Sequence, residues 1–259
     1  MIISIFNQKG GCGKSTTCCN LGAYLSRHGK RVLLVDMDPQ ANLTVSVGVD
    51  DESLDKTIYD LLRSIEIKKD RILEVIQKTS YDRLYIMPSD ITLSDAEITL
   101  SNLMKREERL KKILAEVQDD FDYILIDCPP SLGLLSINAL VCSDYMIIPV
   151  SPSYFSMKGV KHLINTYNLV RDNLNPKLEI MGILITIYNS RKNIAKDIKE
   201  ILIETFGDKV FKNPIRMDVK VENSQDNLIP VIYYSEKSRA AEDYIEFGKE
   251  VLKWTIKTK

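Results

Sequence analysis

Residues 7–16 have the types and the order that phosphate binding requires, and they follow an apolar run at residues 2–6. Their sequence is Asn7-Gln8-Lys9-Gly10-Gly11-Cys12-Gly13-Lys14-Ser15-Thr16. Glycines let consecutive backbone N–H groups converge on one anion, and a helix that starts here adds the partial positive charge of its N-terminus. Lys14 can reach the β- and γ-phosphates, and the Ser15 hydroxyl can ligate Mg²⁺. The stretch therefore predicts a nucleotide-phosphate site; the alternative is a glycine-rich turn with a surface lysine.

Acidic residues end two later apolar runs. Residues 31–36 lead to Asp36 and Asp38, and residues 121–127 lead to Asp127. Continuous apolar runs are typical of parallel strands covered on both faces, and ligands bind at the carboxyl ends of such strands. We expect Asp127 to hold Mg²⁺ through its waters, because this ion keeps most of its hydration shell. A plain Asp-Pro turn after the first strand is the alternative for Asp36 and Asp38.

The elements that must position these residues alternate along the chain. We predict strands at residues 31–36, 84–89, 121–127, 144–150 and 178–188, after the first strand at 2–6. Helices are predicted at 14–28, 57–63, 69–78, 105–117, 156–173 and 244–256, with a mobile loop at 45–55 and a solvated charged face at 105–109. The pattern predicts an α/β fold: a doubly wound, mostly parallel sheet with helices on both faces, in one domain of residues 1–259.

Composition excludes several other classes. The chain has 259 residues, is 44% hydrophobic and can bury a large core. We expect a cytoplasmic protein, because no apolar run approaches the ~20 residues of a membrane span and the N-terminus lacks the regions of a signal peptide. Five cysteines without metal-ligand spacing are interpreted as free thiols rather than disulfides or metal ligands.

The charge is unevenly distributed along the chain. Residues 1–150 carry a net charge of −5 and residues 151–259 one of +4, so a polyanion would dock on the C-terminal part.

The phosphate loop resembles the deviant Walker A motif of the ParA/MinD superfamily, in its ParA/Soj branch. Gln8 stands where the ordinary loop begins with glycine, and a second lysine, Lys9, precedes the glycines. In the family this lysine reaches the phosphates of the partner subunit in a nucleotide-sandwich dimer. The resemblance implies catalytic roles for Lys9 and Lys14. It also implies a nucleotide cradle that comprises Lys9, Gly10, Gly11, Cys12, Gly13, Lys14, Ser15 and Thr16.

Further segments extend the resemblance over nearly the whole chain. Asp36-Met37-Asp38-Pro39-Gln40 matches the family's Asp-x-Asp-Pro-Gln, which implies that Asp38 positions the attacking water. Asp36 then supports the Mg²⁺ shell, together with Ser15 and Asp127. Residues 127–131 and 138–140 also resemble the family, as do Pro88 and Ser89 at the end of a predicted strand. Cofactors implied are ATP and Mg²⁺, and the activity implied is a weak basal ATPase.

Three C-terminal segments resemble family surfaces that bind DNA or adenine. Residues 186–193 place Arg191, with its neighbour Lys192, in the DNA-binding patch, and residues 215–220 add Lys220. Lys237 and Arg239, in residues 233–241, extend this basic face. Arg216 and Asp218 occupy the positions of a proline and an asparagine that contact adenine. Ser153 stands where the family has a glutamate that contacts the partner's ribose.

The resemblance implies a switch. The ATP-bound homodimer would bind double-stranded DNA without sequence preference and be nucleoid-associated, and hydrolysis stimulated by a ParB-like centromere-binding protein would release it. A MinD-like membrane-cycling ATPase is the alternative and would need a lipid-binding tail. A metabolic or redox enzyme of the superfamily is another, and would need substrate-pocket residues or cluster cysteines, for which Cys128 and Cys142 are candidates.

Overall fold

A seven-stranded sheet forms the centre of the computed structural model, which describes residues 1–153 and 156–257. The strands are β1 (Ile2–Ile5), β2 (Val32–Asp36), β3 (Gln77–Lys78), β4 (Leu84–Met87), β5 (Tyr123–Asp127), β6 (Tyr145–Val150) and β7 (Glu179–Ile185). Their order is β3-β4-β2-β5-β1-β6-β7, and every neighbouring pair is parallel except β3 with β4. The predicted fold class is confirmed.

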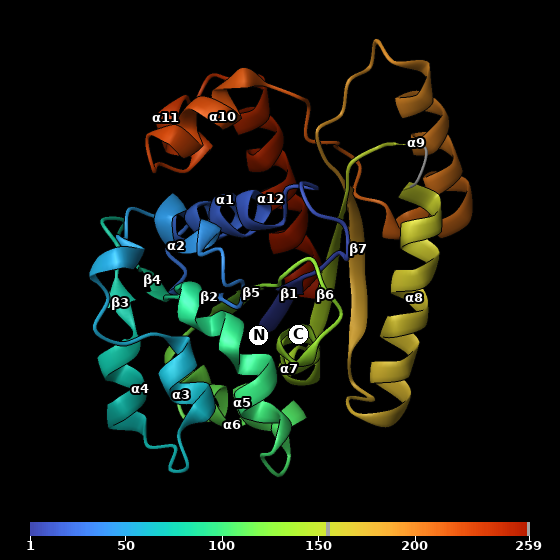
Figure 1. The fold of residues 1–259 in the computed structure, drawn as a ribbon. Coiled ribbons are helices and arrows are strands. Elements are labelled where there is room, and N and C mark those ends of the chain that lie inside the picture. Colours follow the sequence, from blue (N-terminus) through green and yellow to red (C-terminus); the bar gives the residue numbers. More distant parts are fainter. Residues whose placement is uncertain (154–155, 258–259) are drawn as a thin grey trace.

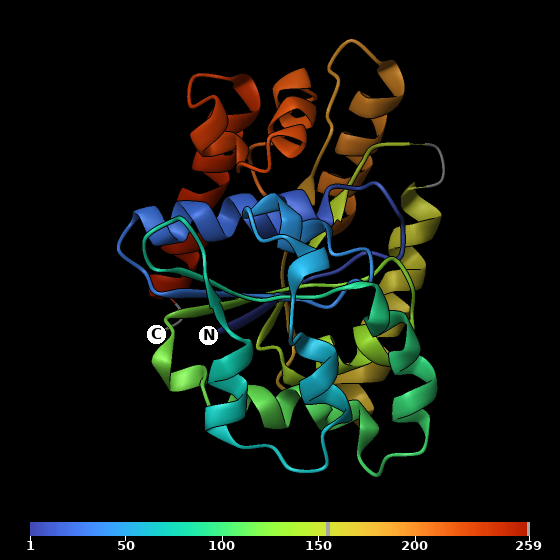
Figure 2. The same cartoon turned by 60° about the vertical axis from the view of Figure 1, so that its left-hand side comes forward.

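Helices cover both faces of the sheet (Figure 1). They are α1 (Lys14–Arg27), α2 (Asn42–Ser46), α3 (Ile58–Arg63), α4 (Lys69–Val75), α5 (Ala96–Ser101), α6 (Arg109–Ala115), α7 (Leu134–Cys142), α8 (Ser156–Asn173), α9 (Asn193–Phe206), α10 (Val219–Asp226), α11 (Val231–Tyr234) and α12 (Arg239–Lys257). Figure 2 shows α1 and α12 above the sheet and α3 to α7 below it. Each face therefore has its own apolar core.

Successive side chains of a strand point alternately into one core and the other. Ile3 and Ile5 of β1 pack with the residues of α1 and α12, whereas Ile2 packs with those of α3 to α7. Leu33 and Leu34 of β2 divide in the same way. Because successive strand side chains point to opposite faces, a strand covered on both sides must be apolar throughout. This explains the continuous apolar runs in the sequence.

Three predictions about local structure are wrong in part. The helix predicted at 69–78 ends at Val75, because Gln77 and Lys78 pair antiparallel with β4. The loop predicted at 45–55 contains the end of α2 and a 3₁₀ turn at Asp51–Ser53. The helix predicted at 105–117 starts only at Arg109, after a 3₁₀ turn.

Arg109 also corrects the prediction of a solvated charged face. Its side chain is buried, and its guanidinium donates to the carbonyl oxygens of Leu62 and Ser64. These carbonyls lie at the end of α3, where a helix leaves acceptors unpaired and favours a positive charge. Arg109 thus holds α3 against α6.

Candidate nucleotide site

The register of the sheet brings the predicted phosphate loop and two acids to one edge. Ile5, the last residue of β1, is paired with Asp127, and Asp127 is paired with Asp36 across β5 and β2. The loop that follows β1 therefore starts beside both carboxylates. This arrangement was predicted from the apolar runs, because parallel strands end at the same edge.

Two glycines give the loop its shape. Gly11 has φ +66° and Gly13 has φ +81°, in the left-handed region that other residues adopt at a cost. Gly13 is the N-cap of α1 and has no side chain to cap it, so the first N–H groups of this helix face the loop. The loop and the helix N-terminus together suit an anion.

Side-chain hydrogen bonds between the loop and distant segments of the chain hold it in place, and the sequence did not reveal them. Asn7 donates to the carbonyl oxygen of Pro149 at 2.7 Å and accepts from the N–H of Lys9 at 3.0 Å. Thr186, just beyond β7, donates to the carbonyl oxygen of Cys12 at 2.7 Å. The loop is thus fixed by β6 and β7, which follow it by more than 130 residues in the chain.

The two loop lysines differ in their surroundings. Lys14 is buried and lies inside the loop, where its Nζ is 3.4 Å from the carbonyl oxygen of Lys9. Lys9 is exposed, and its Nζ donates to Ser153 Oγ at 2.7 Å in the same chain. Ser153, noted above for replacing a family glutamate, therefore holds Lys9 here.

Asp36 and Asp38 lie close to the loop with different environments. Asp36 is fully buried, and burial raises its pKa to about 6, although hydrogen bonds from Thr44 and from the N–H of Asp38 act against this rise. Asp38 is almost fully buried and lines the same pocket as Lys14 and Ser15. Its Oδ1 accepts from the N–H of Gln40 at 3.0 Å. Asp38 thus faces the phosphate pocket, as a residue that positions water requires.

Asp127 fits a magnesium ligand. It is fully buried, and neither of its carboxylate oxygens accepts a hydrogen bond from any described residue. Burial and the nearby Asp36 carboxylate raise the pKa of Asp127 well above its usual range. The Ser15 hydroxyl and the Lys14 ammonium act against this rise, but no described group makes a well-formed hydrogen bond to the buried carboxylate, which a further cation would stabilise. In residues 1–153 and 156–257 no cluster of three or more metal-ligating side chains occurs, so the ion would take further ligands from phosphates and water.

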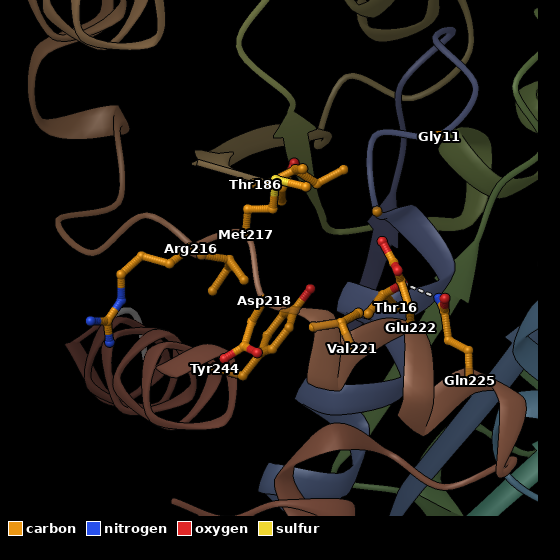
Figure 3. A pocket seen from close by; sticks show the side chains of 13 residues that line it. Gly11, Thr16, Thr186, Arg216, Met217, Asp218, Val221, Glu222, Gln225 and Tyr244 are labelled. Atoms are coloured by element: carbon orange, nitrogen blue, oxygen red, sulfur yellow. Dashed lines mark hydrogen bonds between the residues drawn. The ribbon is translucent and has the colours of Figure 1, made fainter. Parts of the chain in front are cut away.

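Two adjoining pockets extend from the loop. One of about 520 Å³ is lined by Lys14, Ser15 and Asp38. The other, of about 270 Å³, is lined by Thr186, Met217 and Glu222. Gly11, Gly13, Thr16 and Gln225 line both. In Figure 3 Gln225 of α10 donates to the Thr16 hydroxyl, at 3.0 Å. The two pockets together suit a nucleotide, with its phosphate chain in the first pocket and its nucleoside in the second.

The two predicted adenine contacts both line the second pocket, but their side chains are engaged elsewhere. The Arg216 guanidinium points away from the pocket (Figure 3) and binds Asp243 at 2.8 Å. Asp218 caps α10, where it accepts from the N–H of Lys220 at 3.0 Å, and it also accepts from the N–H of Ala240 at 3.3 Å. A base contact from this segment would therefore fall to main-chain atoms. Glu222 and Gln225, which also line the pocket, were not predicted.

Comparison with known proteins agrees with this geometry. A family model described as an AAA domain (AAA_31) matches residues 1–180. The sporulation initiation inhibitor protein Soj of Bacillus subtilis is 43% identical over 250 residues, which cover 96% of this chain and 97% of Soj. The chromosome-partitioning ATPase Soj of Treponema pallidum is 40% identical, over 95% of this chain and 94% of that protein. The chain belongs to the ParA/Soj family of partitioning ATPases.

A solved structure places ligands in this fold. The Mycobacterium smegmatis protein described as cobyrinic acid a,c-diamide synthase, with bound ADP and magnesium, has a TM-score of 0.86 and 31% identity. The alignment covers 100% of this chain and 96% of that one. The fold of a ParA/Soj chain is therefore compatible with a bound nucleotide and Mg²⁺.

The ParA/Soj resemblance also selected five cations for DNA binding. All are exposed, and none forms an ion pair with a described residue. They are Arg191 and Lys192 before α9, Lys220 in α10, Lys237 before α12, and Arg239 at its start. Figures 1 and 2 both draw these segments at the same end of the molecule. Their charge is available to a polyanion.

The cysteines of this ParA/Soj chain are all free and buried. Burial raises the pKa of Cys128 well above its usual range, and it also raises the pKa of Cys142. Both are therefore neutral thiols that pack in the core. Since no metal-ligating cluster forms among the described residues, these cysteines give no support to an iron–sulfur site.

Proposed function

We propose that residues 1–259 act as one domain that binds ATP and Mg²⁺ and hydrolyses ATP slowly to drive DNA partition. One observation carries the proposal: the phosphate loop lies at the sheet edge where Asp36 and Asp127 end neighbouring strands, and its Lys14 shares a pocket with the buried Asp38. Parallel strands that end together converge the groups that phosphoryl transfer needs. Soj relatives at 40–43% identity support the partition role.

Each residue has a role that follows from its place. Lys14 and the N–H groups at the start of α1 hold the phosphates. Ser15 and Asp127 hold Mg²⁺, supported by Asp36, and the ion would neutralise charge on the phosphates. Asp38, which lines the phosphate pocket, positions the attacking water.

The second lysine supports an ATP-dependent homodimer. Lys9 is exposed, and its ammonium group donates to a partly exposed hydroxyl, that of Ser153, so this group can exchange partners at small cost. In the dimer we propose, each Lys9 leaves Ser153 and reaches the phosphates bound by the other subunit. The dimer then closes around two nucleotides.

DNA binding follows from the five unpaired cations. A dimer doubles their number on one surface, and because phosphate contacts add, it binds duplex DNA much more tightly than the monomer. The affinity falls steeply with salt for the same reason. A ParB-like partner then stimulates hydrolysis, and hydrolysis releases the DNA. The protein is therefore cytoplasmic, and it associates with the nucleoid only while ATP is bound.

Fluorescence polarisation tests this proposal. A random-sequence DNA duplex is titrated with the protein in ATP–Mg²⁺ and in ADP–Mg²⁺. Binding only with ATP, weakened by salt and lost in Arg191→Ala, is the expected result. Arg71→Ala is the matched control, because Arg71 is an exposed arginine without an ion pair among the described residues, on α4 at the other end of the molecule. Equal binding in both nucleotides would refute the switch.

The membrane-cycling alternative finds less support. It needs an apolar helix face free for lipid, yet Tyr244, Phe247 and Val251 of α12 are buried in the core shared with α1. Ile245 and Leu252 pack on the edge of that core, whereas Ile256 is 74% exposed. No described helix is long and apolar enough to cross a bilayer. If neither nucleotide state bound DNA, liposome sedimentation would test this alternative next.

A further inference from the structure

A closed ring of hydrogen bonds links Asp36, Thr44, Ser89 and Asp38. Asp36 Oδ2 accepts from the Thr44 hydroxyl at 2.8 Å, and that hydroxyl accepts from the N–H of Ser89 at 3.0 Å. The Ser89 hydroxyl donates to the carbonyl oxygen of Asp38 at 2.8 Å. The N–H of Asp38 donates to Asp36 Oδ1 at 3.1 Å, which completes the ring.

The ring is buried, and the shorter of the two bonds available to the Ser89 hydroxyl, 2.8 Å to Asp38 against 3.4 Å to the carbonyl oxygen of Asp90, belongs to it. Asp36, Thr44 and Ser89 are fully buried, and Asp38 is 6% exposed, so solvent does not compete for these bonds. The Thr44 hydroxyl must point its proton at Asp36, because its oxygen accepts from Ser89. A second bond, from the N–H of Thr44 to Asp36 Oδ2 at 2.9 Å, fixes the same pair. Buried networks of this kind hold their members rigidly when every group is satisfied.

The ring fixes Asp38 from both sides. The N–H of Asp38 is held by Asp36 and its carbonyl oxygen by Ser89, which leaves the carboxylate as the part that faces the phosphate pocket. Thr44 does not line that pocket, but its helix α2 contributes Asn42 and Ser46 to the lining. Any role of Thr44 in hydrolysis therefore acts through the aspartates.

We propose that Thr44 and Ser89 are positioning residues that set the place of the Asp38 carboxylate for ATP hydrolysis. The proposal rests on the ATPase function proposed above. Rates of reaction depend steeply on the position of a reacting group, and a displacement of about 1 Å costs about 10²-fold. Nucleotide binding depends chiefly on the loop and α1, whose residues are not members of the ring.

Three substitutions test the ring. Thr44→Val keeps the shape and removes the hydroxyl, Thr44→Ser keeps the hydroxyl, and Ser89→Ala breaks the bond to Asp38. Single-turnover hydrolysis of γ-labelled ATP gives the rate, and titration with a fluorescent ATP analogue gives Kd. We expect Thr44→Val and Ser89→Ala to hydrolyse ATP about 10- to 100-fold more slowly with Kd changed less than about twofold. Thr44→Ser should restore most of the rate.

The matched control is Thr92→Val, because Thr92 donates to the Asp90 carboxylate in the same kind of bond, but at the exposed surface. It should leave both rate and Kd unchanged. In an Asp38→Ala background, Thr44→Val should slow the residual hydrolysis no further, since Thr44 acts through Asp38.

Several outcomes would overturn the proposal. A normal rate in Thr44→Val, a weaker Kd with a normal rate, or an equal further loss in the Asp38→Ala background would each remove Thr44 from this role. If Thr44→Val fails to fold, Ser89→Ala carries the test by the same criteria. If the unchanged protein binds ATP but never hydrolyses it, the proposed function itself fails. This result differs from a failure of the ring proposal, in which the unchanged protein hydrolyses ATP and the Thr44 variants do so equally fast.

Discussion

Replacing Thr186 by valine tests how the phosphate loop is held. Thr186 is 1% exposed, and its hydroxyl donates to the carbonyl oxygen of Cys12 at 2.7 Å. Valine has nearly the same shape, so the substitution removes one hydrogen bond and creates no cavity. The carbonyl of Cys12, in the middle of the loop, loses a buried partner.

The size of the effect follows from burial. A buried acceptor left without a donor costs about 1–3 kcal/mol. Thr205 offers the matched control: its hydroxyl also donates to a backbone carbonyl, that of Ile201, at 2.7 Å, but at an exposed position on α9. Water replaces the lost partner there, so Thr205→Val should stay within about 0.5 kcal/mol of the unchanged chain.

Urea unfolding followed by circular dichroism measures both variants, and calorimetric titration with ATP measures affinity. Thr186→Val should lower the free energy of unfolding by about 1–3 kcal/mol. It should also weaken ATP binding, because the N–H groups near Cys12 are no longer fixed toward the phosphates. Since about 1.4 kcal/mol is a tenfold change, a loss of up to about tenfold in Kd is expected.

Equal stability of Thr186→Val and Thr205→Val would refute this reasoning. It would mean that the Cys12 carbonyl finds another partner when the hydroxyl is gone. A stability loss without any change in ATP affinity would instead mean that the bond holds β7 in place and leaves the loop unaffected.

Other expectations concern packing, charge and catalysis. Gly248→Ala should lose about 1–3 kcal/mol relative to Gly159→Ala in urea unfolding, because a Cβ at 248 would lie 2.2 Å from Tyr24 Cδ1, whereas nothing described lies within 4 Å at 159. Because the folded chain raises the pKa of Asp36 to about 6, it binds this proton more tightly than the unfolded chain. The unfolding free energy of the unchanged protein should therefore fall, relative to Asp36→Asn, as pH rises from about 4 to about 6; a constant difference would contradict this. Asp38→Ala should keep ATP-dependent dimerisation, seen by light scattering, and retain at most a small residual rate of hydrolysis; hydrolysis at the rate of the unchanged protein would remove Asp38 from its role. Chelating Mg²⁺ with EDTA should abolish phosphate release, and its persistence would argue against a metal at Asp127.

The sequence predicted those parts of the site whose residues are adjacent in the chain or end a strand. The loop and the start of α1 are adjacent in the chain, so glycine, lysine and hydroxyl positions indicate them directly. Asp36 and Asp127 were found because each ends a strand, and the edge where parallel strands end is the same for all of them. A strand end can therefore be recognised from a short stretch of sequence, and it places its residue at a known edge of the sheet.

The parts that were missed depend on pairs that are far apart in the chain. Asn7 meets Pro149 across 142 positions, and Thr186 meets Cys12 across 174. A lone Asn or Thr in a sequence carries no sign of such a partner. Asp218 lines the second pocket, but its carboxylate caps α10, because an aspartate before a helix is also a good N-cap; its contact with a base stays a prediction.

The place of β1 in the sheet has a consequence for how the chain folds. The first strand is also the one whose neighbours come late, since Ile2 pairs with Ile124 and Ile3 with Tyr145. During synthesis at the ribosome, an apolar strand with two open edges must therefore wait for more than 100 residues before either edge is paired. Contacts so distant slow folding and leave intermediates prone to aggregate. The strand that leads into the proposed phosphate loop is thus made more than 100 residues before its partners and is among the last strands to be paired.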